Sequence, residues 1–209
     1  NMRLRNIPNA KDKLDKSNYI IHNYLEMKGN FKKVFFNDNP IYLEIGTGKG
    51  NFIIENAKRY PNINFIGIEK YDSVLVRAIE KIDELELNNL RFIRMDAKEI
   101  ENVFDKEISK LYLNFSDPWP KDRHEKRRLT SDVFLEHYDN IFAGKKIIEF
   151  KTDNRKLFEY SVKSFTDYNY KIQSLSLDLH SDVTDNIMTE YEAKFSNKGQ
   201  LIYYVKVSK

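Results

Sequence analysis

The stretch Ile41-Tyr42-Leu43-Glu44-Ile45-Gly46-Thr47-Gly48-Lys49-Gly50 decides the fold that this sequence predicts. Its first five residues are apolar or aromatic around one acid, which is typical of a strand buried in a sheet. Three glycines at alternate positions follow, and they allow a tight turn and a close approach of the backbone to a ligand. Residues 52–59 then have helical spacing, which Pro61 ends. The pattern predicts a strand, a glycine loop and a helix.

Strands and helices alternate along the chain that follows. Further strands are predicted at 64–68, 90–95, 110–115 and 146–151, and further helices at 72–87, 100–104, 131–142 and 154–164. This alternation predicts a parallel sheet with helices on both faces. The last two predicted strands, 170–177 and 201–207, have no predicted helix between them, which favours an antiparallel pair. The long polar connection between them indicates a functional segment.

Length and composition predict one globular domain. The chain has 209 residues, a formal net charge of +3, and 14 Phe and 13 Tyr, which supply enough apolar surface for a core. Residues 1–33 hold eight Lys or Arg against three Asp or Glu. We therefore expect a single domain over residues 1–209, in which residues 1–33 form a basic N-terminal extension.

Several classes of protein are excluded at this stage. The sequence has no cysteine, and its four histidines lack metal-ligand spacing, so we expect neither disulfides nor a metal. No stretch approaches the roughly 18 apolar residues of a membrane span. The basic N-terminus also lacks the apolar segment of a signal peptide. We expect a cytoplasmic protein with no membrane partner.

Acidic residues stand at the ends of four predicted strands, where ligands bind in an open parallel sheet. These residues are Glu44, Glu69, Asp96 and Asp117. Glu44 would repel a pyrophosphate at the following helix, but it would attract a cofactor that carries an ammonium and a sulfonium. Glu69 has the spacing of an acid that binds ribose hydroxyls, and Asp96 can accept from an adenine amino group. The loop is not the dinucleotide pattern G-x-G-x-x-G, because its third glycine comes one residue early.

Structural explanations of the same residues remain open. The glycines suit an ordinary strand-to-helix turn, and each acid suits a helix N-cap. Asp72 fits the N-cap of helix 72–87 better than Glu69 does, which leaves Glu69 free for a ligand. Capping stays a rival explanation for Asp96.

Together, the acids and the loop resemble the class I S-adenosylmethionine-dependent methyltransferases over about residues 40–175. The resemblance implies an α/β, Rossmann-like fold. Its sheet would be mostly parallel and seven-stranded, with an antiparallel C-terminal strand and helices on both faces. It implies S-adenosylmethionine as the cofactor. The implied cofactor contacts are Glu44, Gly46, Gly48, Gly50, Glu69, Asp96 and Asp117.

The segment F-S-D-P-W-P-K-D-R-H-E-K-R-R, residues 115–128, indicates the substrate. Two prolines flank the only tryptophan and favour a rigid turn beside Asp117. Five cations follow within eight residues, and such a cluster beside a site favours a polyanion over a solvated charged face.

This segment resembles the signature of the bacterial tRNA (guanine-N7)-methyltransferases. Phe150-Lys151-Thr152-Asp153-Asn154 and Thr189-Glu190-Tyr191-Glu192 match the same family. The resemblance implies methyl transfer to N7 of a guanine in the variable loop of tRNA, with Asp117 at the catalytic centre. The implied substrate contacts are Lys121, Asp153, Thr189, Glu190, Tyr191 and Glu192, and the implied RNA contacts are Arg123, His124, Lys126, Arg127 and Arg128. Relatives include monomers and homodimers, and we expect a homodimer in preference to a monomer.

Guanine N7 has a lone pair and no proton to lose, so we expect Asp117 to orient the base rather than to accept a proton. Tyr191 and Trp119 are candidates for stacking on the base, and core packing is an equal alternative for Trp119. The basic arm is a candidate second RNA contact, through Arg3, Arg5, Lys11, Lys13 and Lys16. The alternatives are a methyltransferase for another nucleophile and an RNA-binding protein without catalysis.

Overall fold

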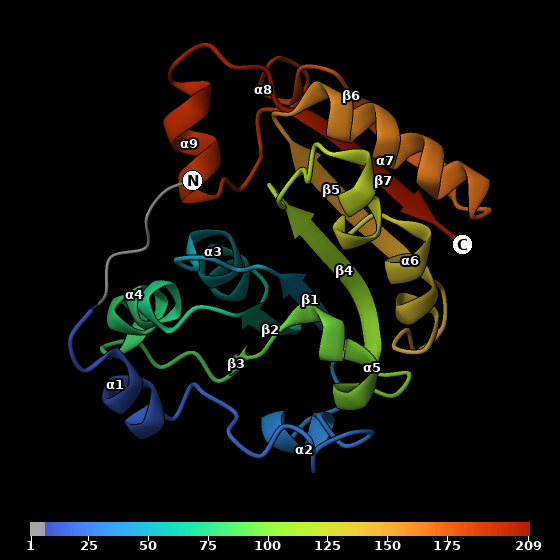
Figure 1. The fold of residues 1–209 in the computed structure, drawn as a ribbon. Helices are drawn as coiled ribbons and strands as arrows, with labels where there is room; N and C mark the ends of the chain where they lie inside the picture. Colours follow the sequence, from blue (N-terminus) through green and yellow to red (C-terminus); the bar gives the residue numbers. More distant parts are fainter. Residues whose placement is uncertain (1–6) are drawn as a thin grey trace.

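A seven-stranded sheet of order β3-β2-β1-β4-β5-β7-β6 forms the centre of the computed structural model, which describes residues 7–209 (Figure 1). Its strands are β1 (Ile41–Ile45), β2 (Asn64–Glu69), β3 (Leu90–Arg94), β4 (Ile108–Asn114), β5 (Ile147–Thr152), β6 (Lys171–Ser176) and β7 (Tyr203–Ser208). Strands β1 to β5 pair in parallel, and β7 pairs antiparallel with both β5 and β6. The predicted sheet is therefore confirmed.

Helices connect and cover these strands. They are α1 (Ala10–Lys16), α2 (Lys32–Phe35), α3 (Asn51–Arg59), α4 (Asp72–Ile82), α5 (Ile100–Val103), α6 (Asp132–Asp139), α7 (Arg155–Asp167), α8 (Leu179–Asp182) and α9 (Glu190–Ser196), with 3-10 helices at Ala97–Glu99 and Asp122–Arg127. The helix predicted at 72–87 ends five residues early, at Ile82, where Leu85 N–H turns back to the Ile82 carbonyl. Helices α8 and α9 lie in the connection that was expected to be a polar loop, so that expectation is wrong.

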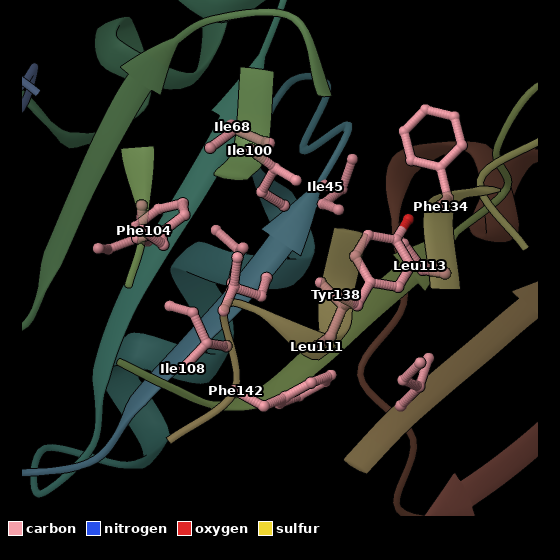
Figure 2. Close-up of a cluster of buried hydrophobic side chains, with 14 of the residues drawn as sticks. Ile45, Ile68, Ile100, Phe104, Ile108, Leu111, Leu113, Phe134, Tyr138 and Phe142 are labelled. Atoms are coloured by element: carbon pink, nitrogen blue, oxygen red, sulfur yellow. The ribbon is translucent and has the colours of Figure 1, made fainter. Parts of the chain in front are cut away.

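The alternation of side chains along β1 divides the core into two layers. Ile41, Leu43 and Ile45 pack with α5, α6 and α7, and Figure 2 shows Ile45 in this layer with Tyr138 of α6. Tyr42 faces the other layer, where α3 and α4 pack. Because side chains alternate, Glu44 lies on the same face as Tyr42 and points toward α3. The site is thus built on the α3 side of the sheet.

The described part of the N-terminal segment packs against the sheet. Leu14 of α1 lies in the same core as α4, and Ile20 bridges to Phe92 of β3. Phe31 is fully buried, and its ring centroid lies 4.7 Å from that of Phe104. Helix α2 lies at the opposite end of the molecule from α8 (Figure 1). Residues 7–35 therefore contribute to the core.

Two further expectations concern the N-terminal RNA-binding arm and membrane-spanning segments. Arg3 and Arg5 of the expected RNA-binding arm lie outside the described residues. Among residues 7–209, no helix combines the length and the apolar character that crossing a bilayer requires.

Replacing Phe31 by Ala should lower the free energy of unfolding by about 3–5 kcal/mol, because it leaves a cavity under α2. Phe36 lies five residues later and is 94% exposed, so Phe36→Ala should change stability by no more than about 0.5 kcal/mol. Urea unfolding measures both variants. Equal stability of Phe31→Ala and the unaltered protein would show that the N-terminal segment is not part of the core.

Candidate active site

A carboxyl group is buried at the end of β1. Glu44 is 1% exposed, and its two oxygens accept hydrogen bonds from Thr47 Oγ1 at 2.5 Å and Asn114 Nδ2 at 2.8 Å. Burial disfavours the charged form and raises the pKa of Glu44 to about 8, although both hydrogen bonds and the nearby Lys151 act in the opposite direction. A cation placed beside this group would favour its ionised form.

The glycine loop after β1 leaves space above the strand end. Gly46, Gly48 and Gly50 all have positive φ, the conformation that glycine adopts most readily. A Cβ at Gly50 would lie 2.8 Å from the Cβ of Ala78, so glycine there lets α3 pack closely on α4. In residues 7–209, no atom would lie within 4 Å of a Cβ at Gly46 or Gly48. The loop therefore has room for a ligand on its outer side.

Glu69 ties the end of β2 to this loop. One of its oxygens accepts a hydrogen bond from the backbone N–H of Gly48 at 3.0 Å, and the other accepts from Lys70 and Tyr71 at 2.9 and 3.2 Å. The oxygen that accepts from Gly48 has a second lone pair for a ligand hydroxyl. Glu69 therefore lies beside the glycine loop.

Asp96 follows β3 and has two partners. It accepts a hydrogen bond from Lys98 N–H at 3.0 Å, which caps the short 3-10 helix, and its other oxygen lies 3.5 Å from Lys70 Nζ. The capping explanation is therefore present in the structure, beside an exposed carboxylate oxygen. Asp72 does not cap α4: Tyr71 is the N-cap residue, and Asp72 pairs with Arg94.

Asp117 lies in a constrained turn after β4. Its neighbours Phe115 and Trp119 both have positive φ, of 54° and 43°. Arg128 donates hydrogen bonds to the carbonyls of Pro118 and Trp119 at 3.0–3.2 Å. Asp117 is therefore exposed to solvent on a turn whose backbone is fixed by Arg128.

The basic run beside this turn has two kinds of residue. Arg128 is half-buried, with its guanidinium 4.4 Å from the ring centroid of Tyr160. Arg127 is exposed and lies over the ring of Trp119 at 5.0 Å. His124 contacts the same ring edge-on. The remaining cations of the run are exposed: Lys121, Arg123 and Lys126. Trp119 is therefore held among cations and is not part of the main core.

Residues 185–196, which we call the cap, bring the last matched motif to the site. Tyr191 Oη donates a hydrogen bond to Asp153 Oδ2 at 2.9 Å, and its ring centroid lies 5.0 Å from that of Phe115. Desolvation and the adjacent Asp153 raise the pKa of Tyr191 to about 12, so the hydroxyl keeps its proton at neutral pH. Tyr191 remains 37% exposed at the mouth of the site.

The other cap residues of that motif make internal contacts. Thr189 caps α9 by accepting from Glu192 N–H at 3.0 Å. Glu190 accepts from Asn51 N–H at 3.1 Å and pairs with Lys81. Glu192 is fully buried. Within this segment, Tyr191 thus faces outward and binds Asp153, whereas Glu192 is buried.

Several polar residues that hold the site were missed by sequence reasoning: Thr47, Asn114, Lys151, His180 and Asn186. Asn114 and Lys151 are register partners at the carboxyl ends of β4 and β5. In the sequence, Asn114 is only a polar residue at the end of an otherwise apolar strand, and Lys151 lies within the matched segment 150–154 without an assigned role. Within residues 7–209, no group of three or more His, Cys, Asp or Glu is arranged to hold a metal ion.

Comparison with known proteins assigns the family. A family model described as "Putative methyltransferase" matches residues 38–205. A tRNA (guanine-N(7)-)-methyltransferase of Geobacillus sp. (strain WCH70) is 55% identical, with 99% of this chain and 95% of the relative covered. One from Lachnoclostridium phytofermentans is 50% identical, with 97% and 96% covered.

A solved SAM-dependent methyltransferase from Aquifex aeolicus shares the fold. Its TM-score is 0.57 at 13% identity, and the match covers 98% of this chain and 99% of that chain. The fold is therefore that of the SAM-dependent methyltransferases. From the relatives at 50–55% identity over nearly the whole chain, we conclude that this chain belongs to the tRNA (guanine-N(7)-)-methyltransferase family.

Proposed function

We propose that the protein transfers a methyl group from S-adenosylmethionine to N7 of a guanine in the variable loop of tRNA. The observation that carries the proposal is the turn 115–119. Its Phe115 contacts Tyr191 of the cap, its Trp119 contacts Arg127 of the basic run, and Asp117 stands exposed between them. Asp117, which can orient a base, thus lies next to the basic run, which can bind RNA, at the end of β4.

The residues at the ends of β1, β2 and β3 suit this cofactor. The cofactor has three kinds of hydrogen-bond donor, and each would meet a carboxylate. The buried Glu44 would bind its ammonium group, Glu69 would bind its ribose hydroxyls, and Asp96 would bind its adenine amino group. The open space above Gly46 and Gly48 admits a ligand close to the backbone, and Gly50 keeps that loop in place. When bound, S-adenosylmethionine supplies a methyl group on a sulfonium.

The substrate residues need only to position the base. Guanine N7 carries an in-plane lone pair and no proton, so no general base is required. We propose that Asp117 accepts hydrogen bonds from guanine N1–H and the amino group, with Asp153 and Tyr191 beside it. The carboxylates would also stabilise the cationic product. Because the major groove of an A-form helix is closed to side chains, a guanine in a loop suits this site better than one in a stem.

The basic run suits the phosphates around that guanine. Arg123, Lys126 and Arg127 are exposed, as is Lys121 at the start of the run, and His124 lies among them. Such a cluster binds RNA mainly through charge. Arg128 completes the run and, at the same time, holds the turn that carries Asp117.

Asp117→Ala should reduce the rate of 7-methylguanosine formation by about 100-fold or more, because a group that orients the base and stabilises the charged product is lost. Unmodified tRNA is incubated with methyl-labelled S-adenosylmethionine, and the nucleosides are then separated. Asp122→Ala, an exposed acid five residues later, is the matched control and should keep the unaltered rate. Label in a different nucleoside, or full activity of Asp117→Ala, would contradict the proposal.

Binding of S-adenosylmethionine should release about one proton at pH 7, because Glu44 is protonated in the free protein, with a pKa of about 8, and must ionise beside an ammonium. Affinity should therefore rise about tenfold per unit between pH 5.5 and 7, below the pKa of an α-amino group. Calorimetry in buffers of different ionisation heat counts the protons. In Glu44→Gln the release should vanish, and a pH-independent affinity of the unaltered protein would refute this role.

We also propose a homodimer in preference to a monomer, and cytoplasmic tRNA as its substrate pool. β6 is an edge strand with exposed Ile172 and Leu175, and Leu177, directly after it, is also exposed. An unpaired edge with apolar side chains favours pairing with another chain. Light scattering should give the mass of two chains, and Leu175→Lys should halve it. A single-chain mass for the unaltered protein would exclude the dimer.

A further inference from the structure

A buried ion pair joins the cap to the sheet, and nothing in the proposed chemistry uses it. Lys151 Nζ of β5 lies 2.6 Å from Glu192 Oε1 of α9, and the two side chains are 4% and 0% exposed. Charges taken out of water in this way are stable only when their hydrogen-bonding partners are all in place. The hydrogen-bonding partners around the pair therefore show which parts of the chain it holds in place.

The carboxylate of Glu192 is engaged on both oxygens. Oε1 accepts from Lys151, and Oε2 lies 2.7 Å from His180 Nε2 and 2.6 Å from Asn186 Nδ2. Lys151 also donates to the carbonyl of Ile187 at 3.0 Å. One ammonium group thus holds both ends of the turn from Ile187 to Glu192.

The residue before Glu192 is held by the same strand end. Tyr191 donates to Asp153, which lies two residues after Lys151. Successive cap residues, Tyr191 and Glu192, therefore bind Asp153 and Lys151 in order, one on the outside and one on the inside. A shift of α9 along β5 would break both contacts together. The buried pair thereby determines where the exposed Tyr191 lies relative to Asp153.

We propose that Lys151 and Glu192 are positioning residues that preform the tRNA-binding segment Thr189–Glu192, an inference that rests on the proposed function. They hold Tyr191 and Asp153 in register at the mouth of the site before RNA arrives. Because the segment is already ordered in the free protein, little further conformational entropy is lost when RNA binds. Glu192 then acts through the position of Tyr191.

Lys151→Met should raise the hydrogen exchange rates of amides in residues 186–198 by about tenfold or more, because the cap loses its anchor. It should also raise KM for tRNA by about tenfold or more and raise the Kd for S-adenosylmethionine by a smaller factor, because Lys151 favours the ionised form of Glu44 only as a nearby charge. Lys163→Met is the matched control, since its exposed pair with Asp167 on α7 serves no site. It should change none of the three quantities.

The double variant Lys151→Met/Glu192→Gln separates positioning from plain stabilisation. It removes both buried charges, so it should regain the melting temperature that the single variant loses, yet keep the raised KM for tRNA. A double variant with normal KM, or a single variant with unchanged cap exchange and KM, overturns the inference and leaves the proposed function standing. Failure of the proposed function is seen separately, as no 7-methylguanosine formed by the unaltered protein, and it overturns both.

Discussion

Three polar groups lie buried side by side at the carboxyl ends of adjacent parallel strands, and the site depends on satisfying them. Glu44, Asn114 and Lys151 lie at or next to the last residues of β1, β4 and β5, on the α3 side of the sheet. Buried polar groups without partners are costly. Asn114 serves Glu44, and the glycine loop adds Thr47, while the cap supplies Ile187 and Glu192 to Lys151. The glycine loop and the cap are thus held at the strand ends by the hydrogen bonds that these buried groups require.

Much of the fold was predictable because its signals are local. The strand, glycine loop and helix at 41–59 repeat in a pattern that permits few topologies. Helix α9 was missed because its buried face carries Glu192 in place of an apolar side chain. An amphipathic pattern therefore never appears there. The end of α4 was misplaced because Leu85 continues the apolar spacing after the helix has ended at Ile82.

The location of a site residue was predictable where it follows directly from the residue's position in a strand. Acids at the ends of parallel strands must share one edge, and Glu44, Glu69 and Asp96 do so. Partners could not be predicted, because they come from distant parts of the chain: Glu190 reaches Asn51 across 139 positions. The basic run is a second example, because the sequence shows only two consecutive arginines. It does not indicate that Arg127 lies on the surface over Trp119 while Arg128 donates to the backbone of the turn.

The place of β7 affects how the protein is made. It lies between β5 and β6 in the sheet, although it follows both in the chain. During synthesis, at about 5–20 residues per second, β6 and the cap leave the ribosome with no strand to join them to β5. The half of the sheet from β3 to β5 has by then been available to fold. The half with the glycine loop can therefore fold on the ribosome, whereas the half that carries the cap is completed only when the last strand inserts.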